Sequence, residues 1–202
     1  MNAGRFFRAF ILFALFTASL ATKAQVAAQF SATPVSGCSP LIVRFTDESQ
    51  GSPNQWRWDL GNGTISFLQN PSATYFSPGK YTVKLVVRNA SSEDSVIKTD
   101  YIEVFANPTI DFSASSTSGC YPLPVNFTDM TVPRSGTITS WLWDFGDGNT
   151  STQQNPSHVY TTARNFNVTL QVRNSNGCVS TLTKTSLIQI STGVLAQFTN
   201  DN

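Results

Sequence analysis

The chain repeats itself, and this repeat constrains the fold more than any other feature of the sequence. Self-similarity at a period of tens of residues indicates successive copies of one structural unit. Two sets of segments recur: 30–31, 36–38 and 45–47 return 82 residues later as 112–113, 118–120 and 127–129, and 56–63 and 69–72 return 85 residues later as 141–148 and 154–157. The change of offset predicts a short insertion near 133–137, in a loop. The sequence therefore predicts two homologous domains in tandem.

The N-terminus has the three parts of a secretory signal peptide. Within residues 1–24, Arg5 and Arg8 precede an apolar core over 10–20, and small residues follow up to Ala24. The apolar core is shorter than the roughly 20 residues that a membrane-spanning helix needs. We therefore predict cleavage after Ala24, export to the cell surface or the medium, and no membrane segment in the mature chain.

The repeat sets the expected domain boundaries. We assign residues 25–106 to a first domain and 107–192 to a second. Residues 193–202 are either a tail or the start of a third repeat, because 196–199 (Ala-Gln-Phe-Thr) resembles 28–31 (Ala-Gln-Phe-Ser).

Each unit is predicted to be all-β. Residues Tyr81, Val83, Leu85 and Val87 alternate with more polar neighbours, which is the period of two of a half-buried strand. The equivalent segment 166–172 keeps this pattern, and Pro, Gly, Asn and Ser separate the strand candidates. No helical period appears after residue 24. Several short strands in 80-odd residues predict an immunoglobulin-like β-sandwich in each repeat.

A tryptophan-rich signature recurs in both units and predicts a core strand followed by a tight turn. Its tryptophans alternate onto one face and would bury about 150–250 Å² per ring. Its glycines supply the positive φ that such a turn requires, and Asp or Asn tolerates the position between them. The residues assigned to this structural motif are Trp58, Asp59, Gly61 and Gly63 in the first unit and Trp143, Asp144, Gly146, Asp147 and Gly148 in the second.

The segment 143–148 (Trp-Asp-Phe-Gly-Asp-Gly), followed by 155–160 (Asn-Pro-Ser-His-Val-Tyr), resembles the polycystic kidney disease (PKD) repeat. The resemblance covers residues 27–105 and 108–191. It implies a β-sandwich module of secreted and cell-surface proteins that serves as a spacer, as an interaction domain, or beside catalytic domains. The first unit departs from the pattern, with Ala73 where the second has His158. Such substitutions argue against catalytic roles for the motif residues.

Charge and composition exclude several functions. The chain has 13 Lys and Arg against 12 Asp and Glu, a net charge of +1 at pH 7, so it lacks the basic stripe of a nucleic-acid binder. His158 is its only histidine, and the carboxylates are scattered, so we expect no enzyme activity. We expect no cofactor either. Calcium is the alternative, with Asp144, Asp147 and Asn149 as ligands, although the acidic residues are sparser than in established calcium loops.

The three cysteines fit an exported protein. Cys120 opens the second unit and Cys178 lies in a turn near its end, so we predict a disulfide between them. Cys38 is then the odd thiol. We expect it to be free and buried, with a bond to another chain as the alternative. A bond to Cys120 would need equivalent points of two domains to lie within about 7 Å of one another.

Two functions follow from these observations. The first is a non-catalytic adhesion module that contacts a protein or glycan through exposed aromatic residues, for which Phe67, Phe76 and Tyr121 are the loop candidates. The second is a structural spacer within a larger secreted protein. The short linker 105–108, stiffened by Pro108, favours the spacer because it would hold the two units end to end.

Overall fold

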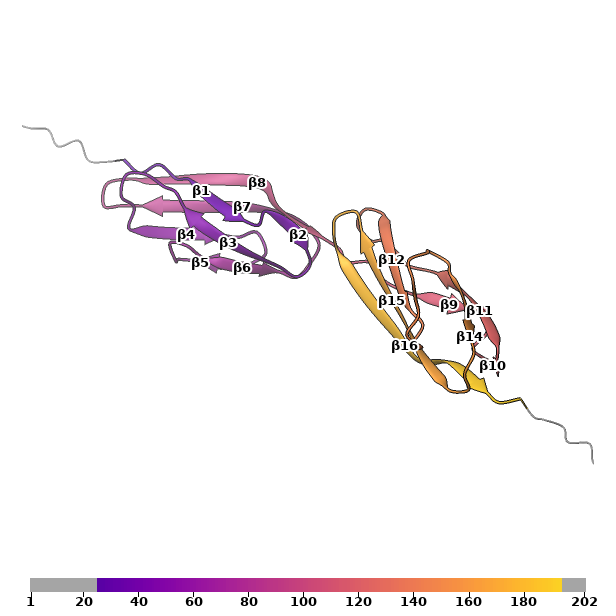
Figure 1. Cartoon of the computed structure of the whole chain (residues 1–202). Coiled ribbons are helices and arrows are strands. Elements are labelled where there is room, and N and C mark those ends of the chain that lie inside the picture. Colours follow the sequence, from indigo (N-terminus) through magenta and orange to yellow (C-terminus); the bar gives the residue numbers. More distant parts are fainter. Residues whose placement is uncertain (1–24, 194–202) are drawn as a thin grey trace, which may run out of the picture.

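The computed structural model describes residues 25–193 of the chain, which form strands and turns without a helix. The strands build two domains of the same design that follow one another end to end (Figure 1). In each domain a three-stranded sheet and a five-stranded sheet enclose one core. The prediction of two tandem β-sandwiches is therefore confirmed. The predicted signal peptide and residues 194–202 lie outside the described residues.

The first domain contains strands β1 to β8. Its smaller sheet has the order β1-β3-β6 and its larger sheet the order β2-β8-β7-β4-β5. The strands span β1 (Phe30–Thr33), β2 (Ser36–Cys38), β3 (Leu41–Asp47), β4 (Gln55–Asp59), β5 (Ile65–Ser66), β6 (Ser72–Tyr75), β7 (Gly79–Arg88) and β8 (Glu93–Phe105).

The second domain repeats this order with strands β9 to β16. Its smaller sheet is β9-β11-β14 and its larger sheet is β10-β16-β15-β12-β13. The strands span β9 (Phe112–Ala114), β10 (Ser118–Cys120), β11 (Leu123–Asp129), β12 (Ile138–Asp144), β13 (Thr150–Ser151), β14 (Ser157–Tyr160), β15 (Asn165–Asn174) and β16 (Val179–Ser191).

The short strands β2 and β10 place a cysteine beside the point where the chain leaves each domain. After β1 has paired with β3 in the smaller sheet, the chain crosses to the larger sheet, where β2 runs parallel to the end of β8. Cys38 is thereby paired with Phe105, the last residue of β8. The second domain repeats this arrangement, with Cys120 paired with Ser191 at the end of β16.

The two domains have separate hydrophobic cores. In the first, the fully buried Trp58 packs edge-on against Phe30, with ring centroids 5.2 Å apart. In the second, Trp143 packs in the same way against Phe112 at 5.1 Å. No strand among residues 25–193 pairs across the linker, so each domain has its own pair of sheets and its own core.

Candidate functional site

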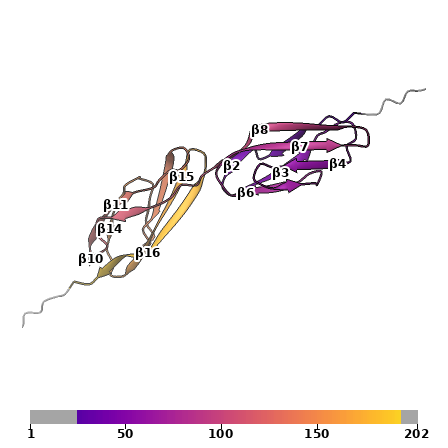
Figure 2. The same ribbon diagram turned by 180° about the vertical axis from the view of Figure 1, so that it is seen from behind.

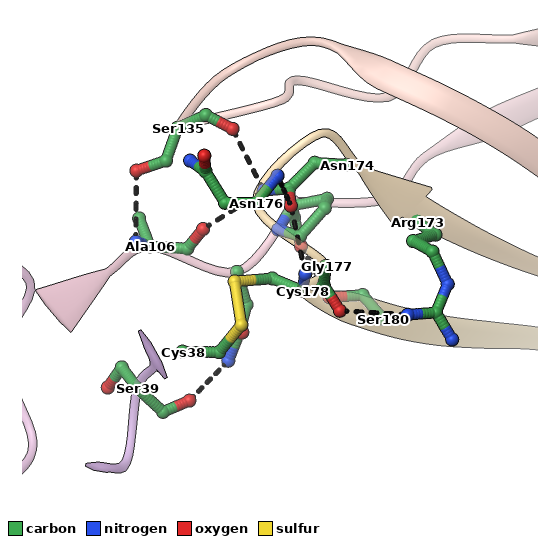
Figure 3. Close-up of a disulfide and its surroundings, with 12 residues drawn as sticks. Cys38, Ser39, Ala106, Ser135, Arg173, Asn174, Asn176, Gly177, Cys178 and Ser180 are labelled. Atoms are coloured by element: carbon green, nitrogen blue, oxygen red, sulfur yellow. Dashed lines mark hydrogen bonds between the residues drawn. A yellow bond between two sulfur atoms is a disulfide. The ribbon is translucent and has the colours of Figure 1, made fainter. Parts of the chain in front are cut away.

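The junction between the domains is closed by a disulfide between Cys38 and Cys178 (Figure 3). Cys38 ends β2 in the first domain. Cys178 lies in the turn between β15 and β16 of the second domain, immediately before β16 begins. Their Cα atoms are 5.5 Å apart, within the normal range for a disulfide. The bridge therefore joins the exit end of one domain to the entry end of the next.

The predicted disulfide between Cys120 and Cys178 is wrong, because these residues lie at opposite ends of β16. Cys178 precedes the first residue of that strand, whereas Cys120 pairs with its last residue, Ser191. A strand of 13 residues spans about 40 Å, while disulfide-bonded Cα atoms lie within about 7 Å of one another. Cys38, expected to be free, is bonded instead, and Cys120 is the free and exposed cysteine among the described residues.

Hydrogen bonds support the bridge on both sides of the linker. Asn107 donates from Nδ2 to the Ser39 carbonyl oxygen at 2.6 Å, which ties the linker to the first domain. The Ala106 amide donates to Ser135 Oγ at 3.0 Å, which ties it to the second domain (Figure 3). The junction is thus held by one covalent bond and by polar contacts to both domains.

Asn174 is the buried polar residue at the centre of the junction, with 1% of its surface exposed. Its Nδ2 donates to the Ser135 carbonyl at 2.8 Å and to the Ala106 carbonyl at 3.5 Å. Its Oδ1 accepts from the amides of Asn176 at 3.1 Å and Cys178 at 2.9 Å. The same side chain therefore shapes the turn that carries Cys178 and contacts the linker.

Replacing Asn174 by alanine is expected to destabilise the second domain by about 2 kcal/mol, because buried donors and acceptors lose their partners. Urea unfolding followed by tryptophan fluorescence measures the loss. Asn176→Ala is the matched control, since that side chain is exposed and sits in the same turn. An equal loss in both variants would contradict the role assigned to Asn174.

A second surface feature is an open groove on the larger sheet of the first domain, with a volume of about 580 Å³. Its lining includes Trp56, Val86 and the exposed Phe67, which was predicted as a contact residue. Charged side chains also line the groove: Arg57, and Arg88 in an ion pair with Glu93.

The second domain does not repeat this groove surface. At the offset of 85, Thr152 takes the place of Phe67, Leu142 that of Arg57 and Gln171 that of Val86. The other two predicted aromatic residues are also exposed, Phe76 in the loop after β6 and Tyr121 after β10, but neither lines the groove.

The signature residues occupy the core and the turn after β4 and β12. Trp58 and Trp143 are fully buried. The carboxylates of Asp59 and Asp144 accept hydrogen bonds from the amides of Gly61 and Gly146. The glycines on either side of the Asn or Asp of the turn have positive φ: Gly61, Gly63, Gly146 and Gly148.

Gly61 and Gly146 also allow a close backbone approach. A Cβ at either glycine would lie 2.4 Å or less from a carbonyl oxygen of the neighbouring strand.

Asp147 and His158 form a pair in the second domain that the first domain lacks. His158 Nε2 lies 2.7 Å from Asp147 Oδ2, and the ring stacks on Phe145. Burial acts to raise the pKa of Asp147, but hydrogen bonds from Asn149 and His158 outweigh it and hold that pKa below its ordinary value. Both carboxylate oxygens of this proposed calcium ligand are therefore engaged by the turn and the histidine. Among residues 25–193 no group of three or more acidic, His or Cys side chains is arranged to hold a metal.

Asp47 organises a polar network that sequence reasoning missed, although its segment is part of the repeat. Its Oδ2 accepts from Trp56 Nε1 at 2.7 Å and from Gln69 Nε2 at 3.1 Å, and its Oδ1 accepts from the Ser49 amide at 3.0 Å. Asp129 makes the equivalent contacts in the second domain. Burial acts to raise the pKa of Asp47, and these hydrogen bonds outweigh burial and lower it.

The first domain is expected to lose stability in acid because of Asp47. A carboxylate whose pKa is lower in the folded state stabilises that state above the unfolded-state pKa of about 3.9. This contribution disappears as the pH falls through the lowered folded-state pKa. Urea unfolding between pH 6 and pH 2 should show this slope, and Asp47→Asn should reduce it. Asp100→Asn, which removes an exposed carboxylate of the same domain, is the control and should leave the slope nearly unchanged.

Comparison with known proteins places this architecture in a family. The sequence profile of the PKD domain matches residues 22–104 and 105–190. A microbial collagenase of Vibrio alginolyticus is 48% identical over 54 residues, which cover 27% of this chain and 7% of the collagenase. Collagenase ColA of Bacillus cereus is 46% identical over 50 residues, which cover 25% of this chain and 5% of that enzyme. The matched part of this chain is thus a small fraction of either relative.

Solved structures of single PKD domains are also similar to this chain. The PKD1 domain of the Vibrio cholerae metalloprotease PrtV is 34% identical, with a TM-score of 0.38, and the match covers 43% of this chain and 99% of that domain. The PKD1 domain of Vibrio anguillarum Epp is 28% identical, with a TM-score of 0.37, and the match covers 42% of this chain and 96% of that domain. Residues 25–193 include no helix that could cross a bilayer. Because the PKD profile matches twice and covers most of the sequence, the chain belongs to the PKD domain family.

Proposed function

We propose that this chain is a non-catalytic, extracellular PKD module that acts as a rigid spacer and keeps its two ends at a fixed separation. The observation that carries this proposal is the disulfide between Cys38 and Cys178 across the domain junction. A linker without such a bridge lets two PKD domains reorient, because so short a peptide buries little surface between them. The bridge gives the junction a second covalent connection, and Asn174 and Asn107 fix the peptide beside it.

The course of the chain supports the same role. The described part begins at the outer end of the first domain and leaves from the outer end of the second, so the ends point away from each other (Figure 2). An extracellular location agrees with the disulfide, since oxidising compartments are where such bonds persist. It also agrees with the family relatives, which are named as collagenases and a metalloprotease.

Nuclear magnetic relaxation of the amide nitrogens tests the spacer directly. In the wild-type protein the two domains should tumble together, with one rotational correlation time. In the double variant Cys38→Ser/Cys178→Ser they should tumble with separate and shorter correlation times. Cys120→Ser is the matched control, because it removes a cysteine without touching the bridge. Separate tumbling of the domains in the wild-type protein would overturn the proposal.

The groove on the first domain supports a second candidate function, contact with a glycan. The exposed Phe67 lines it together with the polar side chains of Asn54, Arg57 and Glu93. Apolar side chains together with a few polar groups are the usual lining of a binding site for an organic ligand.

Binding to a glycan array and to cell-wall polysaccharides, with and without calcium, tests this candidate. Saturable binding that is lost in Phe67→Ala and kept in Thr152→Ala, the equivalent position of the second domain, supports contact through the groove. Loss in Phe76→Ala or Tyr121→Ala instead would move the contact to other loops. Absence of binding under all conditions would leave the spacer as the function.

A further inference from the structure

We propose that Cys120 forms a disulfide with a cysteine in the hairpin turn of a following PKD domain, at the place that Cys178 takes in the second domain. The inference rests on the proposed spacer function and extends it from two domains to an array. Cys120 would then join the second domain to its successor as Cys38 joins the first domain to the second.

The local structure around Cys120 is that of Cys38, which is bonded. In both domains the cysteine ends a three-residue strand that runs parallel to the last strand of the larger sheet. The preceding glycine is packed alike: a Cβ at Gly37 would lie 2.6 Å from Leu41, and one at Gly119 would lie 2.8 Å from Leu123. The first domain therefore shows what a cysteine at this position does when another PKD domain follows it.

The surface at Cys120 is open where the corresponding surface of the first domain is covered. Cys120 is exposed, and its Sγ is 3.9 Å from Ser191 Oγ without a disulfide partner in residues 25–193. A shallow hollow of about 460 Å³ lies over it, lined by Asn165, Gln189 and Ser191 among others. At the end of the first domain the turn that carries Cys178 reaches the equivalent cysteine. The hollow thus lies where the turn of a further domain would dock.

The sequence beyond the second domain has the spacing that such docking needs. Phe105 ends β8, and Phe112, the first core residue of the second domain, follows seven residues later. Ser191 ends β16, and Phe198 follows it by the same seven residues. Phe198 belongs to the segment that resembles the start of the first repeat. A domain beginning there would meet Cys120 through a linker of the same length as the one beside Cys38.

The turn cysteine itself is tied to a junction and is not part of the common domain framework. In the first domain Ser92 takes the place of Cys178: its amide donates to Asn89 Oδ1 as the amide of Cys178 donates to Asn174 Oδ1. Ser92 Oγ accepts a hydrogen bond from the Val26 amide at 2.9 Å. The turn of the second domain meets Cys38 of the preceding domain and carries Cys178, whereas the turn of the first domain carries Ser92.

The bond forms by thiol–disulfide exchange with a small-molecule or protein disulfide as oxidant. The Cys120 thiolate attacks one sulfur of the oxidant, and the other sulfur leaves as a thiolate. The thiolate of the turn cysteine then attacks Cys120 Sγ and expels the rest of the oxidant. In total two cysteine thiols lose two protons and two electrons, and the oxidant disulfide is reduced to two thiols.

A three-domain chain tests the proposal. Residues 25–193 are followed directly by a second copy of 108–193, so that Gly193 replaces Asn107 in the new linker and the spacing is kept. The appended copy carries Cys120→Ser, which leaves its copy of Cys178 as the possible partner. The protein is refolded with reduced and oxidised glutathione, and its disulfides are mapped by mass spectrometry of unreduced peptides.

We expect the bond from Cys120 to the appended copy of Cys178 to be at least tenfold more abundant than the bond to that same appended cysteine in a control chain. The control carries Cys120→Ser and Leu142→Cys in the original second domain, which moves the thiol to another exposed position. A Cys120 that stays free or glutathionylated while Cys38 and Cys178 are bonded would overturn the proposal. An amount of bond equal to that in the control would also overturn it.

A second chain keeps the proposal testable if the appended copy folds poorly. It carries residues 26–106 after Gly193, with Cys38→Ser and Ser92→Cys in the appended domain. Cys120 should bond to the new cysteine at 92, and failure in a folded chain would overturn the proposal. Because the readout is a covalent bond, it is independent of whether the wild-type junction tumbles as one body, so failure of the spacer and failure of this inference are distinguishable.

Discussion

Removing the bridge with Cys38→Ser and Cys178→Ser is expected to lower the free energy of unfolding of each domain by roughly 4 kcal/mol in the chain-entropy view of disulfides. The bridge lies at the junction, and its effect therefore reaches both domains. When the first domain unfolds, Cys38 and the linker close a loop of about 70 residues, and when the second unfolds, the linker and Cys178 close another of similar length. Without the bridge these loops are open, so the conformational entropy of either unfolded domain is higher.

Hydrogen exchange followed by mass spectrometry measures this loss for each domain separately, which matters because two domains need not unfold in one step. Amides of β7 and of β15, the central strands of the larger sheets, report on the first and the second domain. Cys120→Ser is the control and should leave both values within about 0.5 kcal/mol of wild type. A loss confined to the second domain would show that the bridge does not constrain the first.

Replacing Trp58 by alanine is expected to cost the first domain about 3–5 kcal/mol, the range for deleting a buried aromatic side chain. Trp58 is fully buried, lies edge-on to Phe30, and donates from Nε1 to the Leu68 carbonyl at 2.9 Å. The substitution leaves a cavity between the two sheets and an unpaired carbonyl beside it. The second domain has a core of its own. Its free energy of unfolding should therefore change only by the part that it owes to the Cys38–Cys178 bridge.

The same exchange experiment measures the effect of Trp58→Ala in both domains. Phe67→Ala is the matched control: it also removes an aromatic ring from the first domain, but one that is 69% exposed, and should change stability by about 0.5 kcal/mol or less. Equal losses in the two domains of Trp58→Ala would contradict the separation of the cores.

Much of the fold could be predicted from the sequence because the physics involved is local. Alternation in 81–87 fixes which side chains of β7 face the core, and Val83, Leu85 and Val87 are indeed fully buried. The repeat then transfers each assignment from one domain to the other. The insertion near 133–137 falls, as predicted, in the loop between β11 and β12.

The junction could not be predicted in this way, because it depends on how separate units meet. Cys120 was matched with Cys178 inside its own repeat and Cys38 was left free, whereas the pairing of β2 with the end of β8 brings Cys38 to the boundary of the domain. A strand of three residues has too little pattern to reveal a crossover between sheets. The groove beside Trp56 was missed for a related reason, since its lining comes from strands and a loop that are distant in sequence.

The Cys38–Cys178 bridge also determines how the protein responds to a pulling force. The shortest covalent path from Gln25 to Gly193 runs along 25–38, crosses the sulfur atoms and continues along 178–193, so residues 39–177 lie off this path. About 30 residues remain on that path, and fully extended they measure about 100 Å. Stretched by its ends, the oxidised protein therefore reaches a short limiting length even if both sandwiches unravel, whereas the reduced chain would lengthen severalfold.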